Sequence, residues 1–205
     1  IDVGLISAMV ERWRPETHTF HMPQGEMTIT LQDVAGILGL PTNGQVVIGQ
    51  TYTDWAELCN EIFGDGPDAD IELAIGSMRL SYFDRVYPSW DAIAGNPQNV
   101  IYFTKAHIAR MLGSWILCDR SGGGGSVVGC RYITLLGGDF VDIGTYSWGS
   151  AVLANLFRQL CECTDPDRKD IGGCTVLLQI WAWLIFPPIA PPLPAPSEPD
   201  RHFGH

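Results

Sequence analysis

The segment RWRPETHTFHMPQGEMTITLQDVAGILGLP, which spans residues 12–41, decides how the N-terminal part of the chain folds. Pro15 forbids continuation of the apolar helical stripe that ends at Trp13. Residues on either side of PQGE alternate between polar and apolar, and proline and glycine are typical turn residues. The pattern therefore predicts a small β-hairpin directly after a first helix.

The same segment ends with the signals of a short, capped helix. Thr30 precedes Asp33 by three residues, which is the spacing of a capping box, and Gly39 is a suitable helix end. Apolar stripes at helical spacing recur elsewhere in the chain, and Ser147 is the expected cap of one of them. They predict helices within residues 2–13, 53–64, 71–88, 96–119, 147–164 and 174–186.

The composition indicates a chain that folds around one core. Of its 205 residues, 46% are hydrophobic and 17% are charged, a balance that favours burial of apolar surface over disorder. The 23 acidic residues exceed the 12 Lys and Arg residues and give a net charge of -11. Because an acidic surface repels phosphate backbones, direct nucleic-acid binding by this segment is disfavoured.

The longest apolar run ends in a proline-rich tail. CTVLLQIWAWLIFPPIAPPLP is interrupted by Gln179 and by prolines from Pro187 onward, so its helical part is too short for a bilayer and no membrane contact is expected. Residues 187–205 are expected to form an extended tail. The predicted fold class is mainly α, a compact helical domain over residues 1–186 with a small N-terminal β-hairpin. The GGGGS run at residues 122–126 predicts a flexible loop, and a natural and an engineered origin both stay open.

Catalytic chemistry finds little support in the sequence. The glycine run lacks the lysine and the strand–helix context of a phosphate-binding loop. Lys105 lies inside a helix pattern and Lys169 in a charged loop, so neither indicates a Schiff-base lysine. His18 or His21 could pair with a cysteine or with Ser147, but no GxSxG-type elbow supports such a pair. We therefore expect neither an enzyme nor a bound cofactor.

Metal binding is not expected either. The six cysteines are interpreted as reduced, mostly buried thiols, because a chain of this size has its own core. Cys161 and Cys163 are too close in sequence for the usual zinc-binding pair. The hairpin pattern places His18 and His21 on opposite faces, which predicts one packed ring and one solvated ring.

A possible interaction surface comprises Arg12, Arg14, His21, Glu26, Trp148 and Trp181. Structural roles are the alternative for each of them. Arginines at a helix end commonly bind free backbone carbonyls, and large aromatic residues at helical spacing more often belong to a core. Glu26 is expected in the turn of the hairpin.

Several motifs resemble the signature of the plant mobile domain family. The residues 12–49, RWRPETHTFHMPQGEMTITLQDVAGILGLPTNGQVVIG, resemble its opening motif. Later pieces agree in order: ARMLGSWILCDRS, GTYSWGSAVLANLFRQLC and IGGCTVLLQIWAW. The resemblance covers about Leu5 to Phe186. Family members continue past the WAW helix into another conserved section, so we expect a copy that is truncated or divergent on the C-terminal side.

The resemblance implies a function but supplies no catalytic residues. It implies a module that is shared by plant transposable elements and by host nuclear proteins similar to MAINTENANCE OF MERISTEMS. Those host proteins are linked to transposon silencing, gene expression and genome integrity. It implies a nuclear, non-enzymatic module that binds a protein partner, such as a type-7-like phosphoprotein phosphatase. The family label "aminotransferase-like" gains no support from the lysines.

Two other functions remain as alternatives. A transposon-derived, DNA-associated module would need its arginines to converge despite the net charge; these are Arg12, Arg14, Arg79, Arg85 and Arg110. An uncharacterised enzyme would need a concave pocket that holds His18 or His21 together with cysteine or carboxylate partners.

Overall fold

The computed structural model describes residues 1–51, 54–74, 76–89, 95–118, 127–168 and 170–192. Within this part of the chain the fold is compact and mainly α, with small antiparallel sheets, as the sequence predicts. The described helices include none with the length and apolarity needed to cross a membrane.

The N-terminal elements follow the predicted order. They are α1 (Val3–Arg12), β1 (Trp13–Arg14), β2 (Thr19–Met22), β3 (Gly25–Met27) and α2 (Leu31–Leu38). The strands form an antiparallel sheet in the order β1-β2-β3, in which Phe20 lies opposite Met27. The hairpin is thus confirmed, but Glu26 lies in β3 opposite His21 and not in the turn, because the pairing extends to Gly25.

The capping box at the start of α2 is confirmed. The Thr30 hydroxyl accepts a hydrogen bond from the backbone N–H of Asp33 (3.3 Å), and the Asp33 carboxylate accepts one from the Thr30 N–H (2.7 Å). Gly39 ends the helix with φ 64°, a left-handed conformation that glycine adopts without a Cβ clash.

One predicted helix is wrong. Residues 71–88 form β4 (Leu73–Ala74), β5 (Ser77–Arg79) and only then the short α4 (Ser81–Val86). β5 pairs with β6 (Val127–Gly129), a segment far along the chain. The apolar residues of this segment have helical spacing, but the backbone pairs with neighbouring strands and becomes β-structure. Strand formation depends on the tertiary context more than on the local sequence pattern.

The other long predicted helices are confirmed as α3 (Trp55–Phe63), α5 (Pro97–Met111), α8 (Trp148–Glu162) and α9 (Thr175–Ile185). α5 continues as a π-helical segment, η2 (Leu112–Ile116), and three short elements lie between β6 and α8: α6 (Cys130–Ile133), η3 (Thr134–Leu136) and α7 (Phe140–Gly144). The Ser147 side chain does not cap α8 as predicted: its backbone, with φ -78° and ψ 65°, lies outside the extended conformation typical of an N-cap residue, and its hydroxyl donates to Ser150 Oγ (2.7 Å).

The proline-rich tail begins with a short 3-10 helix, η4 (Pro187–Ile189), and not with an extended segment. Proline has no N–H to donate to the carbonyl four residues earlier, as an α-helix requires. A 3-10 turn of three residues forms without that hydrogen bond. The predicted extended state of residues 193–205 and the GGGGS loop lie outside the described residues.

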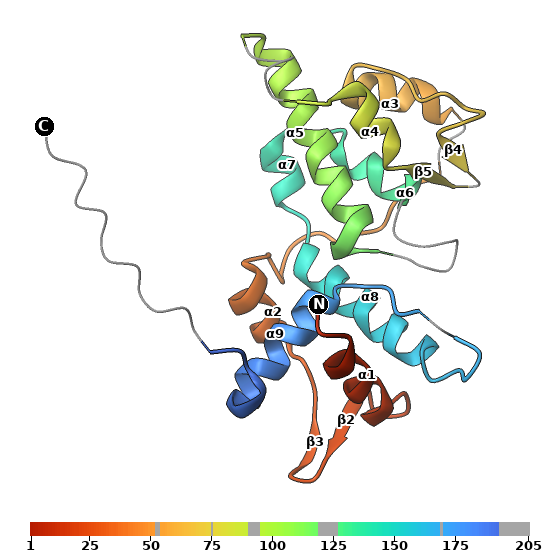
Figure 1. Cartoon of the computed structure of the whole chain (residues 1–205). Coiled ribbons are helices and arrows are strands. Elements are labelled where there is room, and N and C mark those ends of the chain that lie inside the picture. The colour runs from red at the N-terminus through yellow and green to blue at the C-terminus, as the bar shows by residue number, and fades with distance from the viewer. Residues whose placement is uncertain (52–53, 75, 90–94, 119–126, 169, 193–205) are drawn as a thin grey trace, which may run out of the picture.

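The two ends of the described chain meet in one part of the core. α9 packs against both α1 and α2, and α2 also contacts α8, so these elements form the lower half of the molecule in Figure 1, while α3, α4 and α5 form the upper half. The Phe20 ring from the hairpin lies 4.8 Å from Trp13 and 5.5 Å from Trp181, measured between ring centroids. This aromatic cluster joins the N-terminal hairpin to the last long helix.

Candidate interaction site

The arginines at the end of α1 bind backbone carbonyls. Arg12 Nη1 donates to the carbonyl of Ala8 (2.8 Å), and Arg14 Nη1 donates to the carbonyl of Trp13 (3.0 Å). Both contacts match the structural alternative for arginines at a helix end. The two guanidinium groups therefore stabilise the junction between α1 and β1.

His21 and Glu26 form an exposed cross-strand pair on the hairpin. His21 Nε2 lies 3.1 Å from Glu26 Oε1, and the Thr19 hydroxyl donates to the other Glu26 oxygen. His18, by contrast, stacks its ring on Phe157 at a centroid distance of 5.8 Å. Both histidines are exposed, so the prediction of one packed and one solvated ring holds only in that His18 has an aromatic contact. No cluster of three metal-binding side chains occurs in the described part of the chain.

The two tryptophans of the predicted interaction surface lie in the core. Trp148 is 8% exposed and Trp181 is 2% exposed. The Trp148 indole N–H donates to the carbonyl of Ile143 (2.8 Å), and the Trp181 ring packs on Phe20. The exposed part of the predicted surface is therefore polar and consists of the arginines and the His21–Glu26 pair.

The structure reveals an apolar pocket that the sequence did not indicate. The cavity, here called the α7 pocket, has a volume of about 330 Å³ and lies between α5, η2, α7, the start of α8 and the chain that follows α2. Its size is at the small end of ligand sites, which span roughly 300–1,000 Å³. Its walls include Leu40, Ile108, Leu112, Ile116, Phe140 and Trp148.

The lining of the α7 pocket selects apolar groups. The Trp148 N–H is already bound by Ile143, so the indole presents only ring carbons to the cavity. Phe140 is 44% exposed and its neighbour Val141 is 76% exposed, both on α7. Large exposed apolar residues beside an apolar pocket are typical of an interaction site.

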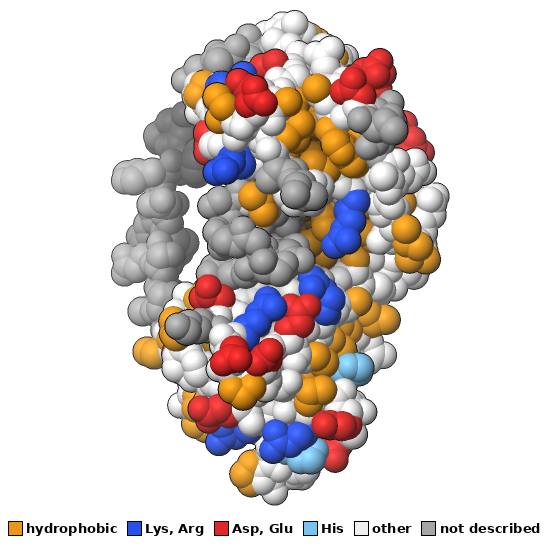
Figure 2. Space-filling view, turned by 90° about the vertical axis from the view of Figure 1, so that its right-hand side faces the viewer, with side chains coloured by type: hydrophobic (Ala, Val, Ile, Leu, Met, Phe, Trp, Pro, Cys, Tyr) orange, Lys and Arg blue, Asp and Glu red, His pale blue; other side chains and the backbone are white. Residues whose placement is uncertain are grey.

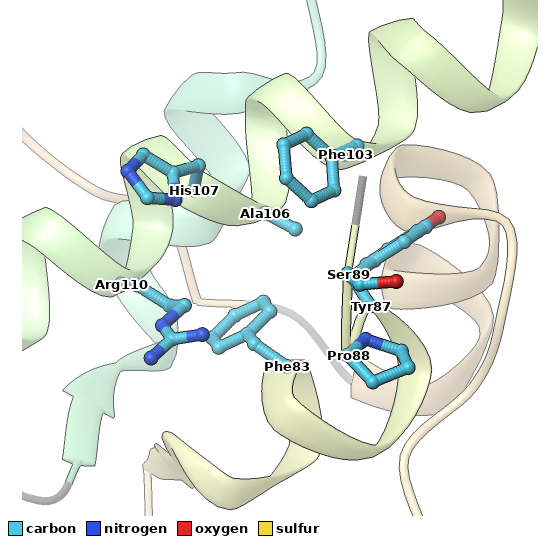
Figure 3. A pocket seen from close by; sticks show the side chains of 8 residues that line it. All are labelled: Phe83, Tyr87, Pro88, Ser89, Phe103, Ala106, His107 and Arg110. Atoms are coloured by element: carbon cyan, nitrogen blue, oxygen red, sulfur yellow. The ribbon is translucent and has the colours of Figure 1, made fainter. Parts of the chain in front are cut away.

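A second, smaller pocket of about 160 Å³ lies between α4 and α5 (Figure 3). Phe83 and Tyr87 face Phe103 across it, and His107 and Arg110 lie along the same side of α5 as Phe103. The imidazole of His107 stacks on Phe103 (6.1 Å between centroids), and the Arg110 guanidinium pairs with Asp84 (2.7 Å). The imidazole of His107 and the guanidinium of Arg110 thus already have structural contacts.

Lys105, Ser147 and the cysteines line neither pocket, and Lys169 lies outside the described residues. Lys105 is buried, its Nζ donates to the carbonyl of Gly137 (3.4 Å), and desolvation lowers its pKa below the usual 10.5. Burial raises the pKa of Cys59 to about 12 and that of Cys130 to about 11, so these thiols stay protonated at neutral pH. All six cysteines are free thiols; Cys59, Cys118, Cys130 and Cys174 are buried, and Cys161 and Cys163 are partly exposed, which agrees with the prediction of mostly buried thiols.

The five arginines of the DNA-binding alternative do not converge. Arg12 and Arg14 lie at the end of α1, at the opposite end of the molecule from α4 in Figure 1. Arg85 pairs with Glu72 and Asp65. On the face drawn in Figure 2, Lys and Arg side chains lie among acidic ones and do not gather in one basic patch.

Comparison with known proteins identifies the class of protein. The model of the plant mobile domain matches residues 1–203, and the chain therefore belongs to the plant mobile domain family. The matched region extends past Phe186, where the resemblance of the motifs ends. No solved structure matches the chain.

The curated relatives are proteins of Arabidopsis thaliana that are much longer than the matched region. The chain is 39% identical over 185 residues to the "Serine/threonine-protein phosphatase 7 long form homolog". This alignment covers 89% of the chain and 13% of that relative. It is 39% identical over 183 residues to "Protein MAIN-LIKE 2", in an alignment that covers 89% of the chain and 26% of the relative. It is 36% identical over 189 residues to "Protein MAINTENANCE OF MERISTEMS", in an alignment that covers 88% of the chain and 37% of the relative.

Proposed function

We propose that this chain is a non-enzymatic, nuclear protein-interaction module, linked through its family to transposon silencing, gene expression and genome integrity. The observation that carries the proposal is the α7 pocket, an apolar cavity of about 330 Å³ next to the exposed side chains of Phe140 and Val141. Such a surface binds apolar side chains of a partner and offers no group that activates a substrate.

The proposed partner is a type-7-like phosphoprotein phosphatase. One relative whose matched region is 39% identical to this chain has a name that contains "phosphatase 7 long form homolog". A domain of this kind therefore occurs in a protein that is named after this phosphatase, which supports an association between the domain and such a phosphatase.

The two alternatives have weaker support. DNA association needs a basic surface, but Arg85 and Arg110 are paired with carboxylates and the net charge is -11. Catalysis by His18 or His21 needs a pocket around the imidazole, whereas His21 lies on the exposed hairpin and His18 stacks on Phe157.

Calorimetric titration of the purified chain with the catalytic domain of a type-7-like phosphatase tests this function. We expect saturable binding that Phe140→Ser weakens by about 1 kcal/mol or more, because a truncated interface aromatic loses its packing. The matched control is Val46→Ser, since Val46 is exposed but does not line the pocket. Absence of binding by the wild-type chain would refute the phosphatase as partner. Imaging of a fluorescent fusion in plant cells tests the nuclear location.

A further inference from the structure

A proline-rich segment begins directly after the last long helix. α9 ends at Ile185, and η4 follows at Pro187–Ile189. The next residue, Ala190, has φ -71° and ψ 144°. These angles match a polyproline II helix, which has φ of about -75° and ψ of about 145°. The described chain therefore takes up the polyproline II conformation where it leaves η4.

Local sterics explain the backbone of Ala190. A residue before proline is steered away from helical angles and toward extended ones, and Ala190 precedes Pro191. Residues 191–194 read Pro-Pro-Leu-Pro, so that Pro191 and Pro194 are three positions apart. A polyproline II helix has three residues per turn, and this spacing is the PxxP pattern that proline-binding domains recognise. The restricted backbone of such a segment loses little conformational entropy on binding.

The segment offers a partner rings and carbonyls but no backbone donors. All four prolines that the structure describes after α9 are exposed: Pro187, Pro188, Pro191 and Pro192. The N–H groups of Ile189 and Ala190 donate to the carbonyls of Phe186 (3.0 Å) and Pro187 (3.1 Å), and proline has no N–H. A partner must therefore supply apolar surface for the rings and hydrogen-bond donors for the carbonyls. Tryptophan and tyrosine side chains combine both.

We propose that residues 190–194 are the ligand of a WW-type domain, a small domain that binds proline-rich segments in a groove lined by aromatic residues. The prolines pack on the aromatic rings of the groove, and ring N–H or O–H groups donate to the backbone carbonyls of the segment. Ala190, Pro191 and Pro192 line no part of the α7 pocket. The inference therefore adds a second partner and does not depend on the phosphatase proposed above.

The charge around the motif favours a WW-type groove over an SH3-type groove. SH3-type grooves commonly pair an acidic side chain with a Lys or Arg beside the proline motif, and such a groove repels an acidic ligand. Residues 170–200 contain no Lys or Arg, and Glu198 and Asp200 follow the motif. The uncharged Pro-Pro-Leu-Pro motif thus fits a groove that recognises proline and leucine without an ion pair.

The aromatic pocket between α4 and α5 fits this segment less well. Its Tyr87 and Phe103 rings are already in edge-to-face contact, with 5.9 Å between centroids and an interplanar angle of 87°. The Tyr87 hydroxyl donates to the carbonyl of Phe63, so it is not available to a ligand carbonyl. Figure 1 places α9 in the lower half of the molecule and α4 and α5 in the upper half. A second copy of the chain would also meet the repulsion between two net charges of -11.

Titration of an isotope-labelled WW domain with the unlabelled chain, followed by NMR, tests the inference. The probe is a WW domain selected for Pro-Pro-Leu-Pro peptides, and its control has the tryptophan of the groove replaced by alanine. We expect saturable shifts in the groove of the first domain and none in the second. Pro191→Ala is expected to weaken binding at least about tenfold, the effect of losing an interface anchor. Leu184→Ala, a change in an exposed apolar side chain of α9 outside the motif, is expected to leave binding within about twofold, because Leu184 is not an anchor.

Both substitutions are at exposed positions, so the fold is retained, and circular dichroism checks this. Absence of saturable shifts with the wild-type chain, equal shifts in the two WW domains, or equal losses in Pro191→Ala and Leu184→Ala would overturn the inference. An SH3 domain that binds as tightly as the WW domain would overturn the assignment of the groove. Binding of the WW domain, together with a phosphatase that does not bind, refutes the partner named above and supports the role of the proline motif.

Discussion

Glu72 is expected to stabilise the fold through a pair of charged hydrogen bonds. It is only 5% exposed, and its carboxylate accepts from Nε and Nη2 of Arg85, both at 2.8 Å, and from the backbone N–H of Asp68, also at 2.8 Å. Arg85 also pairs with Asp65 (3.1 Å). The network joins the chain after α3 to the β4–β5 hairpin and α4, so Glu72→Gln is the perturbation of choice: it keeps the shape and removes the charge.

The size of the effect follows from the burial of the two partners. Breaking a fully buried ion pair costs about 3–5 kcal/mol. The Arg85 side chain is 47% exposed, so water replaces part of what it loses, and the Gln oxygen retains one acceptor. We therefore expect Glu72→Gln to lower the free energy of unfolding at neutral pH by about 2 kcal/mol.

The pH dependence of this difference is the sharper test. The hydrogen bonds from Arg85 hold the pKa of Glu72 below its usual 4.5 in the folded state. The stabilisation is therefore fully present above the unfolded pKa and is lost as the pH falls through it toward the folded pKa. Denaturant titrations of wild type and Glu72→Gln between about pH 7 and about pH 3 should show the difference shrinking on acidification. A difference that stays constant over this range, or that is already below about 0.5 kcal/mol at neutral pH, would refute the reasoning.

Two further substitutions test the N-terminal part of the fold by denaturant titration. Thr30→Ala should lower the free energy of unfolding by about 1 kcal/mol, because the Asp33 N–H loses its capping oxygen. The control Thr30→Ser keeps the hydroxyl and should retain most of the wild-type stability. An equal loss of stability in both variants would contradict the capping role. Phe20→Ala should lower the free energy of unfolding by about 3–5 kcal/mol, because the ring is fully buried between Trp13 and Trp181. His21 is the next residue and is exposed, so His21→Ala should change this free energy by no more than about 0.5 kcal/mol. Similar losses at both positions would contradict the assignment of Phe20 to the buried face of the hairpin and of His21 to the exposed face.

The parts of the fold that were predicted from the sequence depend on nearby residues. The capping box at Thr30, the stop at Gly39 and the start of α5 at Asn96 each act within one turn of helix. The hairpin follows equally from Pro23 and Gly25. Ser147 is the exception, since its backbone lacks the extended conformation that directs a capping oxygen toward a free backbone N–H.

The parts that were missed depend on residues far apart in the sequence. β5 is the central strand between its neighbour β4 and the distant β6, and the chain between β5 and β6 includes the whole of α5. The α7 pocket collects Leu40, Ile108, Phe140 and Trp148 from four separate segments. No periodicity within one segment reports that these side chains leave a space between them.

The sequence by itself determined where most helices begin and end, where the hairpin turns and to which family the chain belongs, because caps, glycines, prolines and motifs are local features. Only the tertiary structure decided that Trp148 and Trp181 are buried, that Arg85 and Arg110 are paired with carboxylates, and that an apolar pocket opens beside α7. The physical reason is that burial, ion pairing and cavities depend on which distant segments pack together.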